Sequence, residues 1–143
     1  MPFPSSHKPP VVIQQRLANY PPDIREKFLI IRSTIIEVAA GHEDIGTVSE
    51  DLKWNEPSFI SRNGSTIRMD WKAQDPKALY LYFHCKTRLI DTFKQLYPQN
   101  FHYIGNRAIR LEQIPEPTLK PLKHCIYMAL LYHRLKHLPM LGQ

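Results

Sequence analysis

Apolar residues recur at three- and four-residue steps in two long segments of the chain, and this spacing predicts a helix in each. The first segment begins at Pro21 and Pro22, whose fixed φ suits a helix start, and stops at Gly41. Its regularly spaced apolar residues are Ile24, Phe28, Ile31, Ile35 and Val38. The second segment, residues 117–138, carries a stripe made of Leu119, Leu122, Ile126, Ala129 and Leu130. A further short helix is expected over residues 11–19.

Between these helices, from Val48 onward, the period changes to two, which is typical of strands with one buried face. In residues 65–72 the apolar set is Ile67, Met69 and Trp71, and the polar set on the other face is Arg68, Asp70 and Lys72. In residues 79–84 the inward set is Leu79, Leu81 and Phe83, and the outward set is Tyr80, Tyr82 and His84. These two segments are predicted to be strands of one sheet.

Short connections complete the pattern. Arg62-Asn63-Gly64-Ser65 predicts a hairpin turn, because Asn and Gly tolerate the positive φ of tight turns. A short helix over about residues 88–96, a turn at Gly105-Asn106 and a strand through Ile109 and Leu111 follow. The expected fold is α+β: a two-layer domain in which N-terminal and C-terminal helices pack on one face of an antiparallel sheet of about five strands.

Length and composition favour one domain over residues 1–143, with an N-terminal extension or short helix in residues 1–20 and a core over about 21–140. Cys85 and Cys125 lie 40 residues apart without a Cys-x-x-Cys spacing, which indicates core thiols rather than a disulfide or zinc site. The first residues lack the apolar stretch of a signal peptide, and no run of eighteen apolar residues exists. A cytoplasmic protein with no membrane partner is expected.

Three stretches carry a family resemblance: SEDLKWNEPSFISRNGSTIRMDW over residues 49–71, LYLYFHCKTRLIDTF over 79–93 and GNRAIRL over 105–111. With these motifs the chain closely resembles the YdhG-like domain family, small α+β proteins of which some are described as frataxin-like iron chaperones. The resemblance spans about residues 20–140 and implies the same two-layer architecture. It also implies iron binding and delivery, with weakly bound Fe²⁺ as cofactor and iron-accepting proteins as partners.

An acidic segment is the best candidate for metal binding, because hard cations prefer carboxylate oxygens. Its five acids are Glu43, Asp44, Glu50, Asp51 and Glu56, with Lys53 as the only base among them. In frataxins, acids near the end of a first helix and along an edge strand form an iron-binding ridge, and the resemblance implies a similar role for these five. A solvated acidic edge without bound metal is the alternative interpretation.

The outward face of the predicted sheet favours a different function. Residues 1–60 hold eight acids against six bases, a balance of −2, whereas residues 61–143 hold thirteen bases against five acids, a balance of +8. Arg68, Tyr80, Tyr82 and Lys86 would place cations beside aromatic rings on that face. Such a surface suits an anion or a single-stranded nucleic acid, although no ribonucleoprotein motif is present.

The Trp54-Asn55-Glu56-Pro57 corner is a second candidate for ligand binding. Trp54 and Glu56 would form the edge of a pocket, because tryptophan offers a large surface and Glu56 a carboxylate. His84, Lys86 and Arg107 lie at strand ends or turns, where they would complete a polar rim. The alternative is that Trp54 fills the core.

No glycine-rich phosphate loop, Gly-x-Ser-x-Gly elbow or His-Glu-x-x-His pair occurs, so the sequence names no catalytic residue and enzymatic activity is not expected. The sequence therefore favours a small binding or carrier module. Iron delivery, anion or nucleic-acid binding, and protein interaction all stay open, as does a monomeric or homodimeric state.

Overall fold

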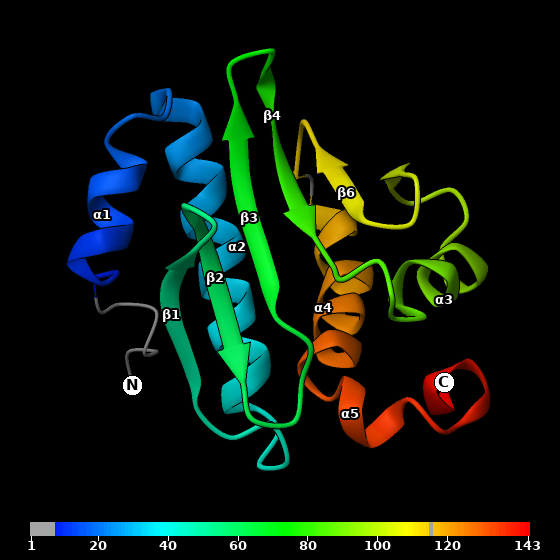
Figure 1. Ribbon diagram of the computed structural model, residues 1–143. Helices are drawn as coiled ribbons and strands as arrows, with labels where there is room; N and C mark the ends of the chain where they lie inside the picture. Colours follow the sequence, from blue (N-terminus) through cyan, green and yellow to red (C-terminus); the bar gives the residue numbers. More distant parts are fainter. Residues whose placement is uncertain (1–7, 115) are drawn as a thin grey trace.

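The computed structural model describes residues 8–114 and 116–143 and shows an open antiparallel sheet with helices packed against it (Figure 1). The strands are β1 (Val48–Lys53), β2 (Glu56–Ser61), β3 (Ile67–Lys72), β4 (Asp75–Tyr82), β5 (His102–Ile104) and β6 (Ala108–Leu111). The helices are α1 (Val11–Leu17), α2 (Pro22–Ala40), α3 (Leu89–Leu96), α4 (Glu116–Leu130) and α5 (Tyr132–Leu135), before a final 3-10 turn, η2 (Pro139–Gly142). The strand order is β1-β2-β3-β4-β6-β5, which confirms the predicted α+β sheet and adds the short β5.

The core lies between the sheet and the pair α2 and α4, which contact each other behind it in Figure 1. The predicted stripe of α2 is buried, and Phe28, Ile31 and Ile35 are completely inaccessible. Met69 of β3 and Leu81 of β4, which are paired in register, are equally buried. Each such side chain contributes about 1.5–3 kcal/mol through the apolar surface that it removes from water. This burial fixes which face of the sheet is left open.

The C-terminal helical segment does not run unbroken to residue 138, as its pattern predicted, because α4 ends at Leu130. The last carbonyls of α4 accept hydrogen bonds from the β2–β3 turn. The Ala129 carbonyl accepts the Ser65 N–H at 2.9 Å, and the Leu130 carbonyl accepts the Ser61 hydroxyl at 2.9 Å. The His133 N–H, which a continuing helix would direct to Ala129, instead donates to the Asn63 carbonyl at 2.9 Å. These tertiary bonds replace the helical ones and turn α5 away from α4.

The β2–β3 turn occurs where it was predicted, but for a different reason. Neither Asn63 nor Gly64 has a left-handed φ. Instead, Gly64 is in close contact with α4: a Cβ added there would lie 2.3 Å from Ser61 Oγ and 2.6 Å from the Leu130 oxygen. Glycine is needed here because the space for a side chain is already filled.

The tight turn with left-handed geometry is instead the β1–β2 hairpin, where Trp54 and Asn55 have φ values of 54° and 62°. Positive φ at both central residues is the type I′ pattern that matches strand twist. Trp54 stands at the tip with 86% of its surface exposed. It therefore does not fill the core, which was the alternative considered from the sequence.

Two further features bear on sequence-based expectations. Cys125 is buried and burial raises the pKa of its thiol, whereas Cys85 is exposed, so the prediction of two core cysteines was wrong for Cys85. Within the described ranges, no helix combines the length and apolarity that a bilayer crossing requires.

Candidate anion-binding cleft

The open face of the sheet carries the polar side chains that strand alternation predicted for it. Arg68 of β3 is paired with Tyr82 of β4, and Tyr80 is paired with Arg110 of β6. Since paired residues project to the same side of a sheet, these four side chains form one surface. The alternate residues Met69 and Leu81 are buried in the core, so this surface belongs to the other face of the sheet, which is turned toward the viewer in Figure 1.

Two adjoining hollows lie on this face, and we call them together the open-face cleft. The larger, of about 590 Å³, lies between β3, the segment after β4 and α5, and includes Lys53, Lys86 and Lys136 in its lining. The smaller, of about 350 Å³, includes Glu56, Lys72 and Arg107. Both are lined by Arg68, Tyr82, Phe83 and His84, so the two hollows lie on either side of the same residues.

The lining of the cleft is strongly cationic. Its six Lys and Arg residues are Lys53, Arg68, Lys72, Lys86, Arg107 and Lys136. Glu56 is the single acid among the lining residues. A concave surface of one charge sign concentrates counter-ions, so the cleft is suited to anions.

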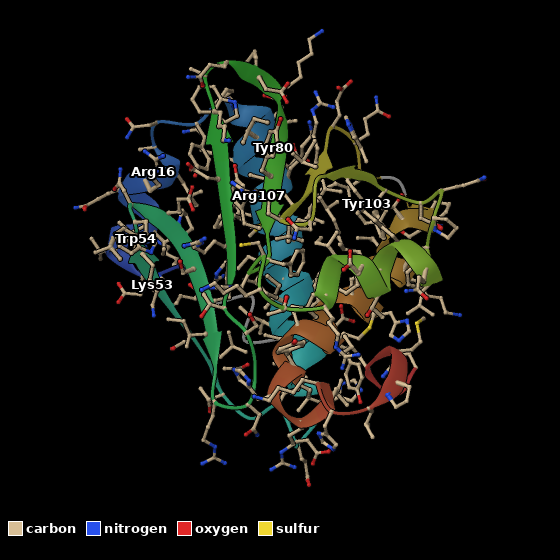
Figure 2. All side chains as sticks on the ribbon, turned by 45° about the vertical axis from the view of Figure 1, so that its right-hand side comes forward. Arg16, Lys53, Trp54, Tyr80, Tyr103 and Arg107 are labelled. Carbon is tan, nitrogen blue, oxygen red and sulfur yellow. The ribbon has the colours of Figure 1, made fainter. Side chains whose placement is uncertain are left out.

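Several of these cations have no internal partner. Lys53, Lys86 and Arg107 form no ion pair with any other described residue. They come from the end of β1, the loop after β4 and the β5–β6 turn. Figure 2 shows Lys53 toward the β1–β2 side of the sheet and Arg107 near its middle. Their charges are therefore available to a ligand from both sides of the cleft.

Tyr82 and Lys72 line the cleft, and Tyr80 lies beside them. The Tyr80 and Tyr82 rings lie 5.9 Å apart between centroids and are inclined by 17°, and Lys72 Nζ lies 5.1 Å and 5.5 Å from them. The Tyr82 hydroxyl is buried and meets no described partner at ordinary hydrogen-bonding geometry. Its looser contact with the Lys72 ammonium raises the pKa of Lys72, while burial raises the pKa of Tyr82. The lysine thus presents a positive charge where a stacked base would have to lie.

Arg110 is also on the open face, but its charge is paired within the protein. Its guanidinium holds both oxygens of Asp75, at 2.6 Å and 2.8 Å, and Tyr80 Oη donates to the same carboxylate at 2.6 Å. The hydrogen bonds from Arg110 and Tyr80 hold the pKa of Asp75 below its usual range. This cluster neutralises Arg110 and fixes the Tyr80 ring beside the cleft.

Most residues named from the sequence as ligand-binding meet in this cleft. Glu56, Arg68, Tyr82, His84, Lys86 and Arg107 line it, and Tyr80 flanks it. Trp54 is not among the lining residues. Sequence reasoning missed Lys136, because only the break between α4 and α5 brings it to the β4 side of the molecule, and no local signal marks that break.

The five acids proposed for iron do not gather at one point. Glu50 faces the helices, where its Oε1 lies 2.6 Å from Arg32 Nε, whereas the next residue, Asp51, is exposed and accepts the Leu52 N–H. Glu43 and Asp44 are exposed after α2, and Glu56 lies in the open-face cleft. Across residues 8–114 and 116–143, no three His, Cys, Asp or Glu side chains are grouped so as to hold a metal ion. Iron binding by these acids stays a prediction.

No protein family model, curated protein or solved structure matches the chain. The resemblance to the YdhG-like family is therefore also left as a prediction.

Proposed function

We propose that the protein is a binding module for a small anionic ligand, carrying phosphate or similar oxyanion groups, in the open-face cleft. The observation that carries this proposal is the lining of six Lys and Arg side chains against one carboxylate. The larger hollow, of about 590 Å³, has the size of a small-molecule site. Arg68 and Arg107 supply guanidinium groups, whose planar donors match the oxygens of phosphate or carboxylate.

The geometry favours contacts with charged groups over base stacking. A single-stranded nucleic acid would use the faces of Tyr80 and Tyr82, but Lys72 Nζ lies over both rings. Tyr80 is further held by Asp75. A phosphate group, by contrast, finds Lys72 already in place as a counter-ion.

Titration calorimetry at low salt with inorganic pyrophosphate and AMP tests the proposal. Arg107→Gln should weaken binding about tenfold, since one charged hydrogen-bonding group is lost from the smaller hollow. Lys120→Gln is the matched control, because it removes the same charge from an exposed position on α4 outside the cleft, and it should leave affinity unchanged.

Two results would contradict the proposal. One is no binding of either probe to the wild-type protein. The other is equal weakening in Arg107→Gln and Lys120→Gln, which would mean that the probes respond to net charge alone. A thymidine oligonucleotide should bind weakly in the same buffer; binding tighter than that of pyrophosphate, with a steep dependence on salt, would point to nucleic acid instead.

A further inference from the structure

Glu56 occupies an unusual position for an acid, in the lining of a cationic cleft. It is the first residue of β2 and is paired in register with Lys53 of β1. Its Oε1 lies 3.5 Å from Arg68 Nε, and both residues line the smaller hollow. Arg68 also lines the larger hollow. Glu56, the one acid that lines the cleft, therefore contacts Arg68, the one arginine that lines both hollows.

The charged groups around Glu56 come from several elements. Lys53 of β1 is its partner in register, and Lys72 of β3 lines the same hollow. Arg107 and His84 line that hollow from the β5–β6 turn and the segment after β4. Arg16 of α1 and Asp70 of β3 also act on it, although these two are bound to each other at 3.0 Å. Tyr82 is its uncharged titratable neighbour.

These surroundings do not all favour the ionised carboxylate. Burial, and then the negative charge of Asp70, raise the pKa of Glu56, while Arg68, Lys72 and Arg16 act in the opposite direction. The contact with Arg68 is also long: the 3.5 Å between Glu56 Oε1 and Arg68 Nε exceeds the length of a charged hydrogen bond of good geometry. It is a weak contact that an external anion with more charge is able to replace.

From this arrangement we infer that Glu56 is an internal counter-ion that occupies Arg68 in the empty cleft and has to give way when an anion binds. The inference rests on the proposed anion-binding function and adds to it a residue that sets affinity and selectivity. A dianion, with its greater charge, displaces the Glu56 carboxylate from Arg68 more readily than a monoanion does. Protonation of Glu56 releases Arg68 in the same way, so that binding tightens on acidification.

Glu56→Gln is the decisive variant, because the amide keeps the size of the side chain and removes the competing charge. Glu112→Gln is its matched control: Glu112 also pairs with an arginine, Arg110, at 3.1 Å, but lies outside the cleft. Sulfate is a suitable probe since its charge is constant over the weakly acidic range. Its dissociation constant should be measured by calorimetry for the three proteins at about pH 7.5 and about pH 5.

At the higher pH, Glu56→Gln should bind sulfate about tenfold more tightly than wild type, and Glu112→Gln should match wild type. At the lower pH the gap between wild type and Glu56→Gln should narrow, because Glu56 is increasingly protonated. His84 and His133 line the cleft in both proteins, so the quantity compared is the ratio of the two dissociation constants at each pH. The preference for sulfate over the monoanion nitrate should be smaller in Glu56→Gln than in wild type.

The failure of this inference is distinguishable from the failure of the proposed function. Equal affinities of wild type and Glu56→Gln, or weaker binding by Glu56→Gln, would overturn the role of Glu56; if Arg107→Gln still weakened binding, the anion site itself would stand. Absence of sulfate and pyrophosphate binding in both proteins would overturn the two proposals together. Thermal melts of each variant should show that all are folded at both pH values.

Discussion

Tyr20 Oη lies 2.5 Å from Asp70 Oδ1, and this hydrogen bond joins the start of the chain to the middle of the sheet. Arg16 binds both oxygens of the same carboxylate, at 3.0 Å and 3.1 Å. The register between β2 and β3 covers only Ser58 with Arg68 and Phe59 with Ile67, so Asp70 lies beyond the paired stretch. Contacts from α1 and Tyr20 thus hold β3 where β2 no longer does.

Asp70→Asn should therefore destabilise the protein by about 2 kcal/mol, because it leaves the partly buried Arg16 without its counter-charge. Tyr20→Phe, which removes one hydrogen bond and keeps the ring, should cost about 1 kcal/mol. Urea denaturation followed by circular dichroism gives both free energies of unfolding. Asp23→Asn, at an exposed carboxylate 3.9 Å from the Lys27 ammonium, is the control and should change stability by less than about 0.5 kcal/mol. An Asp70→Asn protein as stable as the control would show that α1 is not held by this carboxylate.

The ion pair between Asp75 and Arg110 is expected to make the protein less stable in acid. Its pKa is lowered in the folded protein by hydrogen bonds from Arg110 and Tyr80, so the stability that it contributes is present above the unfolded pKa of about 4. That contribution is lost as the pH falls below this value toward the lower folded pKa. The difference in melting temperature between wild type and Asp75→Asn should therefore be largest near neutral pH and should narrow progressively as the pH falls below about 4. A difference that persists unchanged in acid would contradict the ion pair as its source.

Gly64 is expected to tolerate no side chain. A Cβ at this position would lie 2.6 Å from the Leu130 oxygen, a backbone atom that cannot rotate away. Gly64→Ala should cost about 2 kcal/mol in the free energy of unfolding, as overpacked sites do. Gly41→Ala is the matched control, since its Cβ would come no closer than 3.5 Å to its neighbours and its φ of −83° suits alanine. If both variants unfold at the same denaturant concentration, the close packing of the turn on α4 is not limiting.

The iron hypothesis can be tested by titration with Fe²⁺, provided that the variant used for comparison stays folded. Glu50 is paired with Arg32 on the helix side of the sheet, so its replacement would disturb packing as well as any metal. The appropriate variant combines Glu43→Gln, Asp44→Asn, Asp51→Asn and Glu56→Gln. Because these acids do not converge, we expect only weak, non-saturating Fe²⁺ binding under anaerobic conditions, similar in wild type and variant. Saturable binding in wild type that disappears in the variant would instead support a frataxin-like carrier.

The spacing of apolar residues predicted those helices and strands that bury one face and leave the other exposed. The stripe of α2 and the alternation of β3 and β4 are such cases, and the same alternation correctly placed Arg68, Tyr80 and Tyr82 on one surface. Features that depend on distant partners were not predictable in this way. Trp54 was misplaced because Trp-Asn is a rare type I′ pair, and the helix break after Leu130 follows from bonds to a turn far away in the sequence.

The closure of the β2–β3 turn by α4 also has a consequence for the order of folding. A hairpin turn is ordinarily among the fastest elements to form, because its contacts are local. Here the Ser61 hydroxyl donates to a carbonyl 69 positions along the chain. The Ser65 N–H donates to the Ala129 carbonyl at the end of α4, and the Asn63 carbonyl accepts the His133 N–H of α5. The loop closure that brings these partners together must precede the last hydrogen bonds of the turn. The β2–β3 turn, although its residues are neighbours in the sequence, is thus completed only when the C-terminal helix docks.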